Sequence, residues 1–523
     1  MLSKVHHIGP MSVGVLVVSS ATPPSLSAET TSCNEIRHFL FFTSSSSPRH
    51  RRKSMATWAL EYLRNVFVGS RAKHEKNLAV FQKVKPTCFF HKHKKGHRPS
   101  SSSSGDDRRP PCNCASPEAR SGHRIFSDGR YVYLIGGYNP ERDKSASEVQ
   151  FVPFHEEAGP DDPLLREVWA FNVLSDTWKK LSTKGKCPSE MASFSMCPDV
   201  SFTRLVMFGG TGIPFGNSAV NKTRILYLRG PKRLHWEQLS CEGDIPVAGY
   251  GQAMMRQNDR VFYVVGGTTG FEYNMRVSRL IMPDPAEVSR AQTERFETPK
   301  GQWTHQLTGP EGNNPRYRHE AFLVDNKILV FGGGTRDMVV SLEKLDTFDL
   351  ATNVWSQTTT MPDAIHGYPS GRRCHAAVEF DGFVYIIGGC SGHQGIANNL
   401  PPGANNSELA IYNDVWALNL KRVEWQKLNA KLPKRVYFHS AAVTPDGCLY
   451  VFGGVLDGSA QRRSAALHRI WLRPPSLVNF AARSLLKSRP ELRNCSDREL
   501  RIFGVPPSLA AWLNSDDLAD PAA

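Results

Sequence analysis

Three related segments of this chain carry an arginine three residues before a histidine, and this repeated pair is the first place to look for chemistry. The arginines are Arg120, Arg316 and Arg372. A guanidinium binds a carboxylate through two parallel hydrogen bonds, and an imidazole beside it can donate or accept one. Arg120 and His319 are therefore candidate ligand-binding residues. Because the pair repeats, each member is more simply explained as a hydrogen-bonded strut inside a repeated unit.

Two further arginines break this repeat, and we expect them to bind an anion. When the six related segments are aligned, Arg318 and Arg373 fall where the others carry Ser, Gly, Ala, Cys or an aromatic residue. The segments without the Arg-His pair are aligned as 190–193, 248–251 and 436–439. One Arg–carboxylate contact contributes about 1.5–3 kcal/mol, more than a neutral hydrogen bond. Aromatic residues of the same segments would form the rim, with ordinary packing as their alternative: Tyr250, Tyr317, Tyr437 and Phe438.

Two loops rich in glycine and threonine would complete this mouth. They read TGIPFGNS over residues 211–218 and TTGFEYN over residues 268–274. Their backbone N–H groups and the hydroxyls of Thr211 and Thr269 offer hydrogen bonds, and Phe215 offers an apolar wall. Such a site suits an extended peptide whose tip carries a negative charge.

The elements that must position these residues come from a repeat marked by glycine doublets. Six short β-branched or aromatic runs end in Gly-Gly: YVYLIGG (131–137), RLVMFGG (204–210), VFYVVGG (261–267), KILVFGG (327–333), FVYIIGG (383–389) and CLYVFGG (448–454). Five units continue into runs that contain tryptophan. Four short strands per unit, with glycine at the tight turns, are typical of a propeller blade. The sequence thus predicts an all-β, six-bladed propeller over residues 119–473.

The sixth unit is incomplete and predicts how the ring closes. One strand-like run, residues 468–472, follows the last glycine doublet before Pro474 and Pro475 end the sheet. An open propeller would leave two unpaired strand edges. We therefore expect a strand from residues 65–69 or 77–84, within the range 65–90, to complete the sixth blade.

The leader, residues 1–118, has a different composition from the rest of the chain. It contains 18 Lys and Arg residues against 7 Asp and Glu residues, and so holds most of the net charge of +15. A basic, serine-rich segment such as SSSSPRHRRKS (44–54) is expected to be mostly disordered. Binding of nucleic acid or membrane is the less favoured interpretation, because no aromatic residues are interleaved with the charges.

The remaining composition argues against several classes of protein. The eleven cysteines are an odd number without Cys-x-x-Cys spacing, which favours a reducing cytoplasm or nucleus. Cys112 and Cys114 could bind metal, but a structural zinc site needs better-spaced ligands. No apolar run is long enough to cross a membrane, and residues 11–18 make a poor signal peptide. With no hydrolase, kinase or metalloprotease motif, we expect no enzymatic activity, cofactor or metal.

The chain turns from sheet to helix after residue 474. Leu477, Phe480, Ala481 and Leu485 lie on one face of a predicted helix, and their spacing resembles the BC box that docks on elongin C. Its alternative is a helix packed against the propeller base. Further on, VPPSL resembles a cullin-2 box through Val505, Pro506 and Leu509. Residues 474–513 would therefore be a helical elongin- and cullin-binding tail, followed by a disordered end, 514–523.

The repeat resembles the kelch repeat, in which the glycines turn the chain and the tryptophans pack between blades. The motifs GGYNP, GGTGIPFG, YGQAM, RYRHE and RRCH, with the ending IWL and PSL, are similar over residues 119–487 to a family of kelch substrate receptors of cullin-2 RING ubiquitin ligases. The resemblance implies a receptor that reads C-terminal degrons ending in small residues such as Gly or Ala, with elongin B/C and cullin-2 as partners. The same family is linked to stress-kinase signalling through a protein phosphatase, so a non-degradative scaffold remains the alternative.

Overall fold

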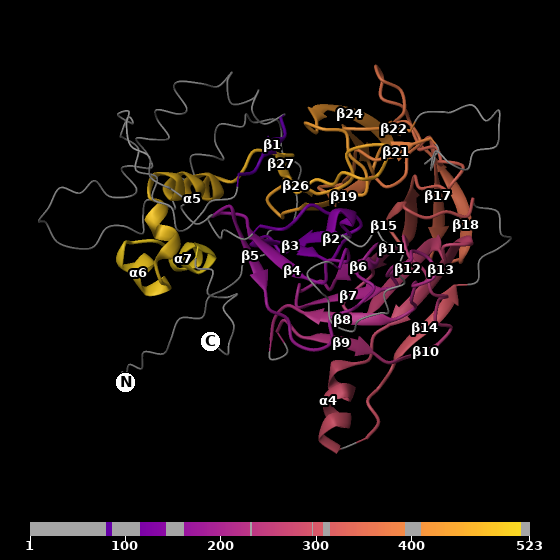
Figure 1. The fold of residues 1–523 in the computed structure, drawn as a ribbon, viewed down its shortest axis with the longest axis horizontal. Coiled ribbons are helices and arrows are strands. Elements are labelled where there is room, and N and C mark those ends of the chain that lie inside the picture. Colours follow the sequence, from indigo (N-terminus) through magenta and orange to yellow (C-terminus); the bar gives the residue numbers. More distant parts are fainter. Residues whose placement is uncertain are drawn as a thin grey trace, which may run out of the picture. The chain divides into compact units, whose positions relative to one another are not determined.

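Six four-stranded antiparallel sheets succeed one another along the chain and form the blades of a β-propeller (Figure 1). The computed structural model describes residues 80–85, 116–142, 162–230, 233–294, 296–306, 314–392 and 409–513. The expected six-bladed propeller is thereby confirmed. The predicted sites at Cys112 and Cys114 and at residues 11–18 lie outside the described residues.

Each blade runs from an inner strand at the channel to an outer strand at the rim. Blades 1 to 3 contain β2 (Arg124–Ser127), β3 (Tyr131–Ile135), β4 (Val168–Asn172) and β5 (Thr177–Leu181); β6 (Ser195–Pro198), β7 (Arg204–Phe208), β8 (Thr223–Tyr227) and β9 (Trp236–Leu239); and β11 (Ala253–Arg256), β12 (Val261–Thr268), β13 (Tyr273–Ile281) and β14 (Gly301–Gln306). Blades 4 to 6 contain β15 (Glu320–Val324), β16 (Lys327–Phe331), β17 (Lys344–Asp349) and β18 (Val354–Thr359); β19 (Ala376–Phe380), β20 (Phe383–Ile387), β23 (Asp414–Asn419) and β24 (Glu424–Lys431); and β25 (Ser440–Val443), β26 (Cys448–Phe452), β27 (Leu467–Trp471) and β1 (Gln82–Lys83).

A few elements decorate the blades. Blade 3 gains β10 (Cys241–Gly243) in parallel beside β14, and β21 (Cys390–Ser391) pairs with β22 (Ala410–Ile411). A short 3-10 helix, η1 (Pro140–Arg142), follows β3. The helix α4 (Pro285–Glu294) lies between β13 and β14 and projects away from its blade (Figure 1).

The blades are held together by apolar layers between them. In β3, Tyr131, Tyr133 and Ile135 pack toward blade 2, while Val132 and Leu134 pack toward blade 6. Because both faces of such a strand are buried, its sequence is apolar at every position. Six clusters of this kind, one at each blade interface, make up the core of the propeller.

The tryptophans and the glycine doublets have the structural roles that the repeat predicts. Trp236, Trp303 and Trp425 are at most 2% exposed and lie in these inter-blade layers. Gly453 shows why the doublet must be glycine: it has φ of 71°, and a Cβ there would lie 2.5 Å from the His123 ring. A larger residue would push blades 6 and 1 apart.

The outer strand of blade 6 comes from the N-terminal side of the chain. Strand β1 pairs antiparallel with β27, joining Gln82 to Arg469. Phe81 enters the layer between blades 5 and 6, and Val84 the layer between blades 6 and 1. The ring is therefore closed within residues 77–84, one of the two segments from which we expected the closing strand.

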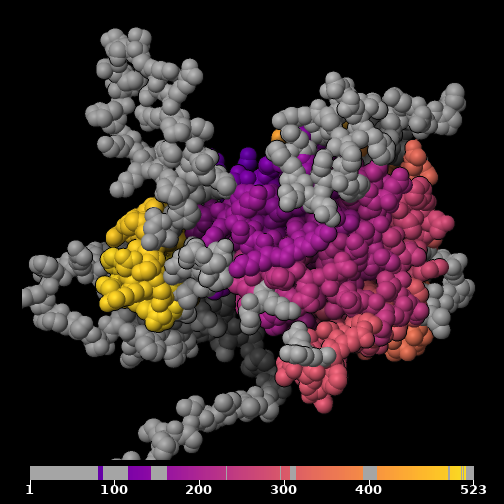
Figure 2. All heavy atoms as spheres, turned by 60° about the horizontal axis from the view of Figure 1, so that its bottom comes forward, coloured from indigo at the N-terminus to yellow at the C-terminus, as the bar shows by residue number. Residues whose placement is uncertain are grey.

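The tail forms a small helical bundle beside blades 6 and 1, visible as the yellow lobe in Figure 2. It contains α5 (Leu477–Ser488), the 3-10 helix η3 (Pro490–Asn494), α6 (Asp497–Ile502) and α7 (Pro507–Leu513). The Ser476 side chain accepts a hydrogen bond from the Asn479 N–H, which caps the start of α5 just after the two prolines. Within the described residues, no helix is long and apolar enough to cross a membrane.

Buried histidines connect adjacent blades near the channel. In His123, His319 and His439 the ring Nε2 donates to a carbonyl of the preceding blade, each at 3.1 Å. Burial lowers the pKa of His319 to about 3, with help from Arg316, and lowers that of His439 to about 4. The folded propeller therefore keeps these rings neutral.

We predict that the propeller loses stability as the pH falls below about 6.5, the ordinary histidine pKa. Only the unfolded chain binds protons at these rings in that range, so each contributes about 1.4 kcal/mol of destabilisation one pH unit below it. Chemical denaturation at pH 7.5 and 5.5 would measure the change. His439→Gln, which copies the Gln252 found at this position in blade 3, should reduce the acid dependence. An unchanged dependence would contradict the explanation.

Candidate functional site

Six backbone hydrogen bonds form a closed ring around one end of the central channel. We call the participants the ring residues, one from each blade: Gly122, Ser193, Gly251, Arg318, Cys374 and Phe438. The N–H of each donates to the carbonyl of the ring residue in the preceding blade, at 2.7 to 3.2 Å, and Gly122 closes the circle by donating to Phe438. All six have φ between 55° and 69°. This left-handed backbone is what turns each chain from the ring into its inner strand.

The loops after the glycine doublets lie at this same end. In every blade the residue before the ring residue bridges to the residue after the doublet, as Tyr250 does to Thr268 and Arg373 to Cys390. We call this end of the channel the mouth. The structure thus brings together the strand starts and loops that the sequence placed at one face.

The ring also corrects our alignment of blades 2 and 3. Segments 190–193 and 248–251 had been aligned with Arg316–His319, but Ser193 and Gly251 are ring residues and correspond to Arg318. Both segments must therefore shift by one residue. The reason is that these blades lack the Arg-His pair, which left nothing to fix their register.

Arg318 reaches across the mouth with unused hydrogen-bonding capacity. Its Nη2 donates to Ser193 Oγ in blade 2, while its buried Nε has no hydrogen-bond partner among the described residues. The guanidinium lies 4.4 Å from the centre of the Phe438 ring, 5.6 Å from Tyr317 and 5.8 Å from Tyr250. A guanidinium stacked on aromatic faces and only partly hydrogen-bonded is well suited to receive an anion.

Arg373, the other predicted anion anchor, is occupied by the protein itself. It is 1% exposed, and its guanidinium donates to the carbonyls of Thr335, Arg336 and Gly392, the last at 3.0 Å. These carbonyls belong to the loops of blades 4 and 5, so Arg373 fastens two loops of the mouth together. The expectation that it points into the mouth is wrong in this structure, because backbone acceptors surround it.

Of the predicted rim residues, three surround Arg318 and the fourth is buried. Tyr250, Tyr317 and Phe438 are half-buried and stack around Arg318. Burial raises the pKa of both tyrosines, so their hydroxyls stay protonated and can donate. Tyr437 is fully buried, and its hydroxyl donates to the Asp457 carbonyl at 3.2 Å. Tyr437 therefore supports the rim from behind.

The loop residues have mixed positions. Thr211 is buried and its hydroxyl binds within its own loop, whereas the half-buried Thr269 accepts hydrogen bonds from the N–H groups of Phe271 and Glu272. Phe215 is 41% exposed and meets Tyr138 edge to face, with ring centres 5.0 Å apart. Phe215 therefore offers an exposed apolar surface, and Phe271 of the second loop, which is 78% exposed, offers another.

Arg120 and His319 do not line the mouth. Arg120 is fully buried and pairs with Glu167 at 2.5 Å. Burial would raise the pKa of Glu167, but Arg120 and Lys180 together outweigh it and lower that pKa to about 2. Arg316 pairs in the same way with Asp346, and Arg372 with Asp414. In the three blades that carry the pair, the arginine is thus a strut within its own blade, while His123 and His319 bond to the preceding blade. The ligand-binding interpretation of Arg120 and His319 is therefore corrected.

Two residues of the mouth were missed by the sequence analysis. Ser193 meets Arg318 from blade 2, and Arg463 lies over the Tyr138 ring at 5.3 Å while its Nε donates to Ser121 Oγ. Arg463 follows the last glycine doublet by nine residues, and that position was the available signal. Arg336, which also follows a doublet, is exposed on its loop.

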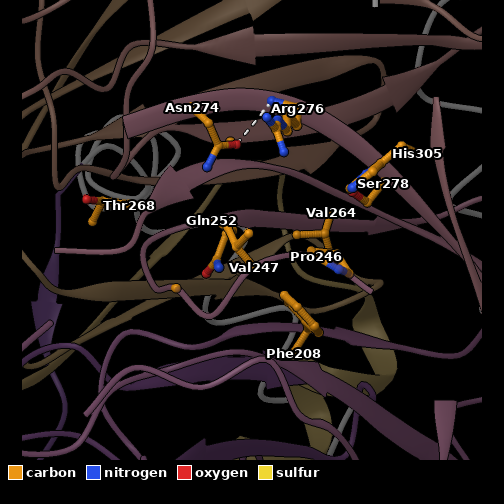
Figure 3. A pocket seen from close by; sticks show the side chains of 12 residues that line it. Phe208, Pro246, Val247, Gln252, Val264, Thr268, Asn274, Arg276, Ser278 and His305 are labelled. Carbon is orange, nitrogen blue, oxygen red and sulfur yellow. Dashed lines mark hydrogen bonds between the residues drawn. The ribbon is translucent and has the colours of Figure 1, made fainter. Parts of the chain in front are cut away.

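A separate cavity lies between blades 2 and 3 (Figure 3). Its lining includes Phe208, Gln252 and the hydrogen-bonded pair Ser278 and His305, whose Oγ and Nδ1 are 2.9 Å apart. Gln252 occupies the position where four blades carry a histidine. The cavity volume of about 20 Å³ is room for one water molecule, so the cavity cannot hold a peptide.

The predicted elongin-binding residues are split between surface and core. Leu477, Phe480 and Ala481 are half-buried, while Leu485 is 9% exposed and packs inside the helical bundle. The predicted cullin-binding residues Val505 and Leu509 lie in the same core, and Pro506 is half-buried. Ile502 and Phe503, which were not singled out, are instead 73% and 54% exposed.

Comparisons with known proteins agree with the fold. Residues 102–286 and 284–473 match the family model of the KLHDC2/KLHL20/DRC7 Kelch-repeats domain. The chain is 36% identical over 403 residues to the human protein named Kelch domain-containing protein 10, covering 75% of this chain and 79% of that protein. It is 32% identical over 410 residues to the Drosophila melanogaster homolog, covering 75% and 61%. Bovine Kelch domain-containing protein 2 is 25% identical over 398 residues, covering 73% and 87%. The expected family resemblance is confirmed.

We predict that the two arginines of the mouth differ in their effect on stability. Arg373→Ala should lower the free energy of unfolding by about 2–4 kcal/mol, because it leaves several loop carbonyls without a donor. Arg318→Ala should change it by less than about 1 kcal/mol, because one hydrogen bond is lost and a poorly satisfied charge is removed. Urea denaturation would measure both. Equal losses would show that Arg318 is also a structural residue.

Proposed function

This chain belongs to the kelch-repeat family matched above, and from that premise we propose that it is a substrate receptor of a cullin-2 and elongin B/C ubiquitin ligase. A kelch propeller of this family is a protein-interaction module. In the proposal, the mouth binds the C-terminal tail of a target protein and the helical tail recruits the ligase. Ubiquitin transfer is left to the catalytic subunits of the ligase.

The observation that carries the proposal is the arginine with spare donors at the centre of the mouth. A C-terminal carboxylate could accept from the Arg318 guanidinium, which donates to Ser193 and stacks on three aromatic rings. Arg373, whose Nη atoms donate to loop carbonyls, would hold the loops around it. The C-terminal carboxylate is an anion that every protein carries, and it always follows the last peptide unit with the same covalent geometry.

The shape of the mouth supports a preference for small terminal residues. The Arg318 side chain is enclosed by Tyr250, Tyr317 and Phe438 at 4.4 to 5.8 Å. These rings leave little space beside the guanidinium for a bulky final side chain. Tails that end in Gly or Ala fit this constraint, with Phe215 available to contact residues farther from the end.

The ligase side of the proposal rests on the order of elements after the propeller. Leu477, Phe480 and Ala481 keep part of their surface open at the start of α5, where a partner such as elongin C could cover them. The exposed Ile502 and Phe503 give cullin-2 a further apolar surface. A complex of this kind places the protein in the cytoplasm, the nucleus or both.

One observation favours a second candidate, a non-degradative scaffold in stress-kinase and phosphatase signalling. Leu485, Val505 and Leu509 are buried against one another, so the bundle is satisfied without a partner. On this alternative, α5 to α7 only pack against the propeller. The elongin experiment below separates the two candidates.

For the mouth, we predict that a peptide ending in Gly or Ala loses at least about tenfold in affinity when its C-terminus is amidated, because a charged hydrogen bond contributes about 1.5–3 kcal/mol. Arg318→Ala should weaken the free-acid peptide to the same level and leave the amidated peptide unchanged. Fluorescence polarisation would measure both. The matched control is Arg336→Ala, an exposed arginine on a neighbouring loop. Equal affinity for acid and amide in the unmodified protein would exclude the carboxylate site.

For the tail, we predict that Leu477→Asp lowers capture of elongin B/C by at least about tenfold, since it puts a charge into an apolar contact. The helix itself should tolerate the change, because an acidic residue in the first turn is favourable. Val478→Asp adds the same charge at a 46% exposed neighbour and serves as the control. Undiminished capture by Leu477→Asp, or no capture by the unmodified protein, would select the scaffold.

A further inference from the structure

An ion pair spans the central channel just below the mouth. Arg124 begins the inner strand of blade 1, and Glu320 begins that of blade 4. Their Nη1 and Oε1 atoms are 2.7 Å apart. Since blade 1 packs on blades 2 and 6, and blade 4 on blades 3 and 5, the two residues reach each other from opposite sides of the ring.

The pair is the exception at its level of the channel. Both residues stand two positions after a ring residue, and the other four blades carry small side chains there: Ser195, Ala253, Ala376 and Ser440. These four side chains are short and buried, and the hydroxyls of Ser195 and Ser440 bond to backbone groups. At this level, only blades 1 and 4 therefore carry side chains long enough to meet across the channel.

The pair is held firmly in this position. Arg124 also donates from Nε to the Phe194 carbonyl of blade 2, at 3.3 Å. The Arg124 side chain is 25% exposed and that of Glu320 is 19% exposed, so both are mostly buried and each keeps a part that solvent can reach.

We propose that the Arg124–Glu320 pair is the floor of the mouth and makes it selective for chain ends. This inference rests on the proposed function, because it concerns the peptide that enters beside Arg318. Glu320 follows Arg318 by two residues, at the start of the inner strand of blade 4. A carboxylate bound at Arg318 would thus have the ion pair directly beyond it, leaving no room for further residues. Recognition would combine a charge at the end of the peptide with a barrier to its continuation.

The test compares two peptides, one ending in Ala and the same peptide extended by Gly-Gly, both with free carboxylates. The unmodified protein should prefer the shorter peptide by at least about tenfold, the factor expected from losing the charged contact. R124S/E320A gives blades 1 and 4 the side chains found in the other blades, and should reduce this preference below about threefold. Its midpoint of thermal unfolding should stay close to that of the unmodified protein.

The matched control is R124E/E320R, which reverses the pair and keeps the barrier, and so should retain the preference. If R124S/E320A does not fold, R124K/E320D shortens both side chains, leaves the charges in place and should weaken the preference. If a folded variant with shortened side chains at 124 and 320 kept the full preference for the shorter peptide, the proposal that this pair forms the floor of the mouth would be wrong. Failure of the unmodified protein to bind either peptide would instead refute the proposed function, so the two failures are distinguishable.

Discussion

The closed circle of six backbone hydrogen bonds at the mouth is the interaction on which the arrangement of the site depends. It joins blades whose broadest contacts are apolar layers, and those layers have no directional preference of their own. Because every ring residue must donate to one blade and accept from the next, its backbone is left-handed in all six blades. The side chains at these six positions are consequently free to differ, and Arg318 is one such difference. The fold thus requires the left-handed backbone at these six positions, whereas the side chains there can change without breaking the circle.

Arginine serves three distinct purposes within a short distance of this circle. Arg120, Arg316 and Arg372 are buried with carboxylates inside their blades. Arg373 is buried with carbonyls between two loops, and Arg318 is stacked on three aromatic rings and donates to a serine of another blade. The same guanidinium group therefore braces a blade, joins two loops or is a candidate ligand-binding group, depending on which acceptors surround it. Residue type alone could not distinguish these roles.

The fold could be predicted from the sequence because its signals are local and repeated. Glycine doublets require turns within a few residues, and tryptophans mark five of the six buried layers between blades. The site was harder to predict, because its contacts cross between blades. Arg318 meets Ser193, a residue 125 positions away whose register had no local marker. Likewise, the apolar period of 477–486 predicted the helix α5, but the sequence could not show that Val505 and Leu509 would cover one of its faces.

The pairing of β1 with β27 has a consequence for biosynthesis. Gln82 emerges from the ribosome long before its partner Arg469, and every blade is made between them. Strand β1 therefore stays unpaired, with Phe81 and Val84 exposed, until the last blade has been made. Contacts between residues so distant in sequence also form slowly. Asp176 of blade 1 then binds both Arg469 of blade 6 and Arg483 of α5, so the tail is anchored across this same seam. A nascent chain released too early would lack both the closed ring and the site that orients its tail, and would be recognisable to chaperones by its unpaired first strand.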